Sequence, residues 1–259
     1  MSSAFRSCVL LATLGLAAAV GARELRVCAD PDNLPFSRED GTGFENRIAD
    51  LVATHLHADL RYYWLPDRRG FLRKTLNAHE CDLVMGLPVE SERALTTPAY
   101  YRGTYVFVYR GEDTGRLESL DDPRLRSLRI GVALVGNDLA ATPPAMALAR
   151  RGIVGNVTGF PMFGEGSIGQ RMTNAVREGA IDVAVLWGPQ AGYFARDGVP
   201  ALTVTPIAPA AGVASTFAIG MGVRRDDGAL RDEMAGALSA LKPQIDAVLD
   251  AYAVARVSP

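Results

Sequence analysis

The sequence is poor in the residues that usually mark a metalloprotein or a nucleic-acid-binding protein. It has only 3 cysteines and 3 histidines in 259 residues, and no Cys-x-x-Cys or His-Glu-x-x-His motif brings any of them to ligand spacing. Its 27 basic and 29 acidic residues give a formal net charge of -2, without the basic excess typical of nucleic-acid binding. These shortages predict a protein that holds no metal or cofactor and binds no nucleic acid.

Long apolar runs are also scarce, and the clearest one lies at the start of the chain. Residues 8–20 are apolar, follow Arg6 and lead into small residues that end at Ala22. This pattern is typical of a cleavable signal peptide, because a membrane-spanning helix needs about 20 apolar residues. We expect residues 1–22 to be removed on export, with no stable membrane insertion afterwards. Cys8 lacks the preceding small residues of a lipoprotein site and leaves with the signal.

Cleavage leaves two cysteines, Cys28 and Cys81. An even pair in an oxidising compartment favours a disulfide. Bridging needs Cα atoms within about 7 Å, which the strand register decides, so two buried thiols stay the alternative.

Strand and helix patterns alternate along the chain and predict an α/β fold with two units in series. In the first unit strands are expected at 25–30, 60–65 and 82–86, and helices at 43–57 and 69–78. In the second unit strands are expected at 128–133, 157–160 and 181–186, and helices at 138–151, interrupted near Pro143-Pro144, and at 168–178. Between and after the units we expect a strand at 104–109, a polar lobe crossing at 111–123, a strand at 216–223 and a helix at 228–253 bent at Pro243.

Several motifs along this pattern resemble those of two-lobed (type 2) periplasmic solute-binding proteins. They are Asp30 at a strand end, Pro35-Phe36, Gly43-Phe44-Glu45, Asp82–Gly86, Glu90–Arg93 and Pro98–Tyr101. The resemblance covers residues 24–257. It implies two lobes, each a mainly parallel sheet flanked by helices, joined by a two-strand hinge. The first lobe would comprise 23–110 and 215–259, and the second lobe 111–214.

A narrower resemblance is to the substrate-binding-like proteins that accompany quinoprotein (PQQ) methanol dehydrogenases in methylotrophic bacteria. It rests on the order and spacing of residues 27–37, 68–71, 81–86, 100–108 and 187–189. The resemblance implies a periplasmic accessory protein without a cofactor, which binds the dehydrogenase or assists its activation. The alternative is the solute-binding component of an ABC importer for a small ligand that is not an amino acid.

The resemblance also indicates which residues face the cleft between the lobes. Arg93 stands where amino-acid binders hold the ligand carboxylate, but Glu90 replaces their threonine. A Glu90–Arg93 pair on a solvated loop is an equally good interpretation. Trp187 stands where the second lobe of those binders supplies an aspartate for the ligand ammonium group. Ordinary amino acids are therefore not the expected ligands.

The other expected cleft residues are polar groups at turns and two aromatic side chains. They are Asp30, Asn33, Gly86, Asn137 and Asp138, with Phe36 and Trp64 beside Trp187 as aromatic anchors for a ligand or a protein partner. The three histidines, His55, His57 and His79, do not form a catalytic pattern, and no nucleophile motif or P-loop is present. We therefore expect no enzyme activity.

Overall fold

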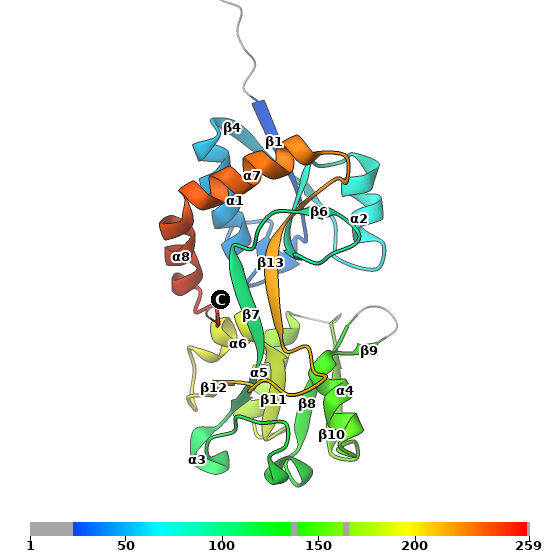
Figure 1. The fold of residues 1–259 in the computed structure, drawn as a ribbon. Coiled ribbons are helices and arrows are strands. Elements are labelled where there is room, and N and C mark those ends of the chain that lie inside the picture. The colour runs from blue at the N-terminus through cyan, green and yellow to red at the C-terminus, as the bar shows by residue number, and fades with distance from the viewer. Residues whose placement is uncertain (1–22, 136–138, 163–165, 258–259) are drawn as a thin grey trace, which may run out of the picture.

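The computed structural model describes residues 23–135, 139–162 and 166–257, which form two lobes one above the other (Figure 1). The proposed signal peptide at 1–22, together with Asn137 and Asp138, lies outside the described residues. Among the residues that are described, no helix is long and apolar enough to cross a membrane.

The first lobe contains a parallel three-stranded core in the order β5-β1-β4. Its strands are β1 (Arg23–Ala29), β4 (Ala58–Trp64) and β5 (Leu83–Pro88), with the short strands β2 (Asp32–Asn33), β3 (Ser37–Arg38) and β6 (Leu95–Thr96). Its helices are α1 (Phe44–His55), α2 (Phe71–Lys74), a 3-10 turn (Leu76–Ala78), α7 (Gly228–Ala240) and α8 (Lys242–Ala251). Helix α1 packs on the sheet because Phe44, Ile48 and Val52 recur every fourth residue, and all three are buried.

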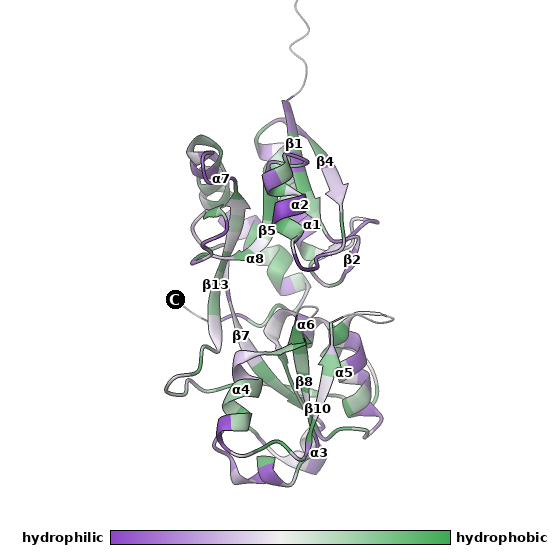
Figure 2. Cartoon of the chain, turned by 90° about the vertical axis from the view of Figure 1, so that its right-hand side faces the viewer, coloured by the Kyte–Doolittle hydropathy of each residue, from purple (hydrophilic) through white to green (hydrophobic). Residues whose placement is uncertain are grey.

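The second lobe repeats this arrangement with a parallel core in the order β10-β8-β11. Its strands are β8 (Ile130–Val135), β9 (Ala140–Ala141), β10 (Val157–Pro161), β11 (Val183–Trp187) and β12 (Thr203–Pro206). Its helices are α3 (Gly111–Thr114), a 3-10 turn (Pro123–Arg126), α4 (Pro143–Arg150), α5 (Ile168–Arg177) and α6 (Gly188–Ala195). Two buried clusters cover the two faces of this sheet, and Figure 2 shows its central strands at the hydrophobic end of the scale.

Two long antiparallel strands connect the lobes, β7 (Tyr101–Tyr109) and β13 (Thr216–Val223). The first residues of β7 pair with β13, and its later residues pair with β11 and β12 of the second lobe. The chain therefore crosses between the lobes within β7. The expected crossing at 111–123 is wrong, because Leu117 and Leu120 of that segment are buried in the second lobe. The α/β two-lobed fold is confirmed, while the exact lobe boundaries stay a prediction.

Prolines account for two other differences from the expected elements. The helix expected at 228–253 is two helices, α7 and α8, which meet at Leu241. Pro243 lies in the first turn of α8, where its missing N–H costs nothing. The helix expected at 138–151, with an interruption near Pro143-Pro144, begins only at Pro143, because proline suits the first turn of a helix. Ala140–Ala141 before it pairs with β8.

The C-terminal segment, residues 251–257, attaches the helices of the first lobe to the second lobe. Tyr252 stacks on Tyr193 of α6 with ring centroids 5.7 Å apart, and Arg196 donates a hydrogen bond to the Ala251 carbonyl at 2.9 Å. Farther on, the Val257 N–H donates to the Arg102 carbonyl on β7 at 3.0 Å. The segment thus forms a third connection between the lobes beside the two strands.

Gly192 of α6 permits this close approach. A Cβ atom at this position would lie 1.8 Å from the Ala253 carbonyl oxygen, which is backbone and cannot rotate away. We expect Gly192→Ala to lower the free energy of unfolding by about 2 kcal/mol. Gly236→Ala on α7 is the matched control, since a Cβ there meets nothing within 4 Å, and it should raise stability by about 0.5 kcal/mol. Urea unfolding measures both, and equal midpoints for the two variants would contradict the expectation.

Candidate functional site

A cavity of about 360 Å³ lies between the lobes, and we call it the interlobe cleft. Both lobes and both connecting strands contribute to its wall. The lining residues are Asn33, Phe36, Glu45, Asp67, Met85, Gly86 and Pro88 of the first lobe, Ala133, Val135, Thr142, Met162, Ile168, Trp187 and Gln190 of the second, and Tyr101, Tyr105, Phe217 and Ile219 of the strands. Within the described residues, no lysine, arginine or histidine lines it.

Trp187 anchors an aromatic wall in the interlobe cleft. Its ring centroid lies 5.2 Å from that of Tyr105 on β7 and 5.9 Å from that of Phe217 on β13. Gly103 leaves space for the indole, because a Cβ there would lie 2.4 Å from Trp187 Cζ2. The indole therefore packs against the backbone of β7, at the point where the chain passes from one lobe to the other.

Glu45 is a buried carboxyl group on the first-lobe side of the interlobe cleft. It follows Phe44 in the first turn of α1, its exposed fraction is 7%, and its Oε1 accepts a hydrogen bond from the Tyr100 hydroxyl at 3.1 Å. Burial raises the pKa of Glu45 to about 7, against the opposing effect of the Tyr100 hydrogen bond. Glycine is required at position 86 opposite it, because the backbone φ angle there is +73° and a Cβ atom would lie 2.5 Å from Glu45 Oε1.

Two more carboxylates, Asp30 and Asp67, lie near Glu45. The Asp30 carboxylate accepts the backbone N–H groups of Asp32 at 2.9 Å and Asp67 at 2.6 Å. Neighbouring protein atoms exclude water from the Asp67 carboxyl group, and this desolvation, followed by repulsion from the charge of Asp30, raises the pKa of Asp67 to about 6. Glu45 and Asp67 are therefore two carboxyl groups at this end of the cleft whose charge changes near neutral pH.

A larger cavity of about 1240 Å³ lies in the first lobe beside the disulfide, and we call it the lobe-1 cavity. It shares Asn33, Glu45, Asp67, Met85 and Gly86 of the first lobe and Met162 of the second lobe with the interlobe cleft. The two cavities therefore adjoin, but the side chains around the lobe-1 cavity include six arginines, which are Arg68, Arg69, Arg73, Arg93, Arg224 and Arg225.

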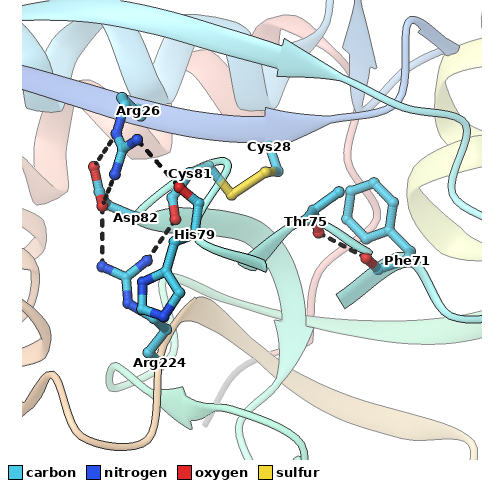
Figure 3. Close-up of a disulfide and its surroundings, with 8 residues drawn as sticks. All are labelled: Arg26, Cys28, Phe71, Thr75, His79, Cys81, Asp82 and Arg224. Carbon is cyan, nitrogen blue, oxygen red and sulfur yellow. Dashed lines mark hydrogen bonds and ion pairs between the residues drawn. A yellow bond between two sulfur atoms is a disulfide. The ribbon is translucent and has the colours of Figure 1, made fainter. Parts of the chain in front are cut away.

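The Cys28–Cys81 disulfide is confirmed, with Cα atoms 5.5 Å apart (Figure 3). It joins β1 to the residue two positions before β5, which is the neighbouring parallel strand. Beside it, Asp82 accepts hydrogen bonds from Arg26 at 2.8 Å and Arg224 at 3.0 Å. Burial acts to raise the pKa of Asp82, but these hydrogen bonds outweigh it and the pKa is lowered. The disulfide and the ion pairs together fix the wall of the lobe-1 cavity.

The structure brings most of the expected cleft residues together, in two groups. Asn33, Phe36, Gly86 and Trp187 line the interlobe cleft. Asp30, Asn33, Gly86 and Arg93 line the lobe-1 cavity. That any of them binds a ligand or a partner stays a prediction.

Trp64 and Glu90 line neither of these two cavities. Trp64 stacks on Tyr62, with ring centroids 4.5 Å apart, because alternate residues of β4 share one face. Glu90 is exposed, and among the described residues it forms no ion pair with Arg93, so the expected pair is wrong. The sequence interpretation missed Glu45, Asp67, Tyr101, Tyr105 and Phe217 in the cleft, although Glu45 belongs to a motif quoted for the fold.

No protein-family model matches the chain. It is 33% identical over 250 residues to Protein MoxJ of Methylorubrum extorquens, which covers 90% of this chain and 81% of MoxJ. The chain belongs to the MoxJ family. This confirms the resemblance to the substrate-binding-like proteins of methanol oxidation. An 87-residue part is also 41% identical to MoxJ of Paracoccus denitrificans, covering 33% of this chain and 32% of that protein.

Solved structures agree with membership of the MoxJ family. The crystal structure of the periplasmic binding protein XoxJ from Methylobacterium extorquens AM1 matches with a TM-score of 0.76 and 36% identity, covering 91% of this chain and 100% of XoxJ. MxaJ from Methlophaga aminisulfidivorans matches with the same TM-score of 0.76 at 23% identity, covering 90% of this chain and 100% of MxaJ. An ancestral cationic amino acid solute-binding protein matches with a TM-score of 0.70 at 19% identity, covering 89% of this chain and 95% of that one. The last two likenesses show the fold alone.

Proposed function

We propose that the protein is a non-catalytic accessory of a quinoprotein (PQQ) methanol dehydrogenase system, which binds the dehydrogenase or assists its activation in the periplasm. The observation that carries this proposal is the MoxJ-family similarity over 90% of the chain. Membership places the chain among periplasmic-binding-protein-like members of methanol oxidation systems. Export through cleavage of residues 1–22 is part of the proposal.

The interlobe cleft supports a role other than amino-acid binding. A zwitterionic amino acid needs a cation for its carboxylate and an anion for its ammonium group. Arg93, the expected cation, lines the lobe-1 cavity and not the interlobe cleft. Trp187 replaces the second-lobe acid with an indole that is already packed against Tyr105 and Phe217. The cleft thus has an indole at the position of the second-lobe acid, and its described wall holds no cation for a ligand carboxylate.

We expect calorimetry of the purified protein against the common amino acids to show no binding tighter than about 1 mM, because the missing charged partners each cost on the order of 1 kcal/mol or more. The ligands tested should include glutamate, lysine and leucine. A folded sample, verified by circular dichroism, is the control. Micromolar binding of any one amino acid would contradict the expectation.

The alternative function, a solute-binding component of an ABC importer, is favoured by the size of the interlobe cleft. Its volume of about 360 Å³ lies within the range of small-molecule sites, which is about 300 to 1,000 Å³. Neighbouring genes discriminate the two functions. A permease and an ATPase would support import, and a dehydrogenase with a cytochrome c would support the accessory role.

Deletion of the gene in the source bacterium tests the proposed function. We expect the deletion strain to lose growth on methanol and periplasmic methanol dehydrogenase activity, while growth on a multicarbon substrate is unchanged. The wild-type gene should restore both properties, and Trp187→Ala should not. Trp64→Ala is the matched control, because it removes the other tryptophan from a site outside the interlobe cleft. Normal methanol growth of the deletion strain would refute the accessory role.

A further inference from the structure

The lobe-1 cavity has an apolar floor. Phe71, Val84 and Leu87 line it and pack in the same hydrophobic cluster as the two cysteines of the disulfide. Thr75 fixes the short helix α2 at this wall by donating a hydrogen bond to the Phe71 carbonyl at 2.8 Å (Figure 3). The floor is therefore an apolar surface against which an apolar side chain can pack.

Five exposed arginines line the same cavity without an ion pair. Arg68 and Arg69 precede α2, Arg73 lies within it, Arg93 follows β5, and Arg225 follows β13. Within the described residues, none of the five guanidinium groups makes a hydrogen bond or ion pair with another side chain. This distinguishes them from Arg224 at the same wall and from many arginines elsewhere, which are bound to carboxylates.

The acidic residues of the lobe-1 cavity do not satisfy these arginines. Asp30 already accepts two backbone N–H groups, and Glu45 accepts the Tyr100 hydroxyl. Asp67 lies with them at the end that adjoins the interlobe cleft. Glu92 and Asp226 also line the cavity and are exposed, beside Arg93 and Arg225 in the sequence, but they form no ion pair with either. The guanidinium groups are therefore available to carboxylates from another molecule.

The size of the cavity and the distribution of its charges favour a polypeptide segment as the occupant. A volume of about 1240 Å³ exceeds the range of about 300 to 1,000 Å³ that suits a small molecule. Guanidinium groups bind carboxylates through paired hydrogen bonds, and here they come from three separate chain segments around an apolar floor. An extended chain with alternating acidic and apolar side chains would satisfy the rim and the floor together.

We propose that the lobe-1 cavity is the docking site for an acidic segment of a protein partner, whose carboxylates pair with Arg68, Arg69, Arg73, Arg93 and Arg225 while its apolar side chains contact Phe71 and Leu87. The proposed function enters only in naming the partner, which is the methanol dehydrogenase. This contact uses the arginines of the lobe-1 cavity, which the interlobe cleft adjoins at Glu45 and Asp67.

The test compares two double variants of the full mature chain. Arg69→Glu/Arg73→Glu reverses two charges at the cavity, and Arg47→Glu/Arg102→Glu reverses two exposed arginines that also lack an ion pair but do not line it. One probe is a fluorescein-labelled peptide of alternating Glu and Leu, followed by anisotropy. The other is the purified dehydrogenase, followed by calorimetry. Both probes are titrated from about 20 to 300 mM NaCl, since exposed charge pairs weaken with ionic strength.

We expect the wild-type chain to bind both probes, with affinity that falls as salt rises. The cavity variant should lose about 30-fold in affinity and the control variant less than about threefold, because charge reversal replaces attraction by repulsion. Equal binding of both probes by the two variants would overturn the docking site and leave the proposed function intact. The peptide could bind the control variant more tightly than the cavity variant while the dehydrogenase binds no form of the protein. In that case the docking site stands and the proposed function fails. Equally tight competition by free glutarate would assign the arginines to a small anion and overturn the proposal.

Discussion

Removal of the disulfide, by Cys28→Ala/Cys81→Ala, is expected to lower the free energy of unfolding by about 4 kcal/mol. The bond closes a loop with a sequence separation of 53 residues. Opening this loop returns conformational freedom to the unfolded chain, which favours unfolding. Urea unfolding followed by circular dichroism measures the difference.

A reductant separates the effect of the covalent bond from that of the lost sulfur atoms. Cys28 and Cys81 are 1% and 0% exposed, so their replacement also changes the packing of the first lobe. Wild-type protein with dithiothreitol should approach the stability of the double variant, whereas the variant should not respond to dithiothreitol. Two titratable thiols in untreated protein would show that the bond is not formed. A loss below about 1 kcal/mol in the double variant would show that the bond does not stabilise the fold.

Replacement of Glu45 by glutamine is expected to stabilise the protein by about 3 kcal/mol above pH 7, with little change near pH 4. The pKa of Glu45 is about 7 in the folded protein against an ordinary value of 4.5. The folded state therefore holds more protons than the unfolded state between these values, and wild-type stability falls as the pH rises through them. Glutamine cannot ionise, and its carbonyl oxygen can still accept the Tyr100 hydroxyl.

The measurement is urea unfolding of wild type and Glu45→Gln at half-unit steps from pH 4 to pH 8. Asp67, with a pKa of about 6, acts in the same direction, so the difference between the two proteins isolates Glu45 from it to first order. Glu90→Gln is the control, because Glu90 is an exposed carboxyl group without an ion pair, and its effect should stay below about 0.5 kcal/mol at every pH. Parallel curves for wild type and Glu45→Gln would contradict the expectation.

The sequence predicts the sheets well because their buried strands are continuous runs of apolar and small residues, whether they pair in parallel, as β11 does with β8, or antiparallel, as β13 does with β7. The run expected at 181–186 appears as β11 at Val183–Trp187, and the run at 216–223 appears unchanged as β13. Helix α1 was predictable from the spacing of Phe44, Ile48 and Val52. The disulfide was only partly predictable from the sequence. The even number of cysteines expected after signal cleavage favours a pair, but the register of β1 with β5 is what brings the two cysteines together.

Most of the site depends on tertiary contacts that a linear pattern does not contain. An acidic residue in the first turn of a helix is usually exposed, so nothing in the sequence shows that Glu45 is buried against Tyr100. The helix expected at 69–78 is broken at Thr75, where the backbone leaves the helical region at φ -118° and ψ -88°. Phe71 and Arg73 before the break, and Asn77 after it, all line the lobe-1 cavity. The same limits apply to Trp64, whose stacking on Tyr62 depends on which face of β4 is covered.

The third connection between the lobes restricts how they can move. With β7 and β13 alone, the lobes could open by bending the strands about one axis. Opening that separates α6 from residues 251–257 would also unstack Tyr193 from Tyr252 and break the hydrogen bond from Arg196 to Ala251. Such motion exposes aromatic surface and leaves a backbone carbonyl to water, so the interlobe angle is largely preset. A molecule that enters the cleft is therefore selected by its fit to an existing opening rather than enclosed by lobes that close around it.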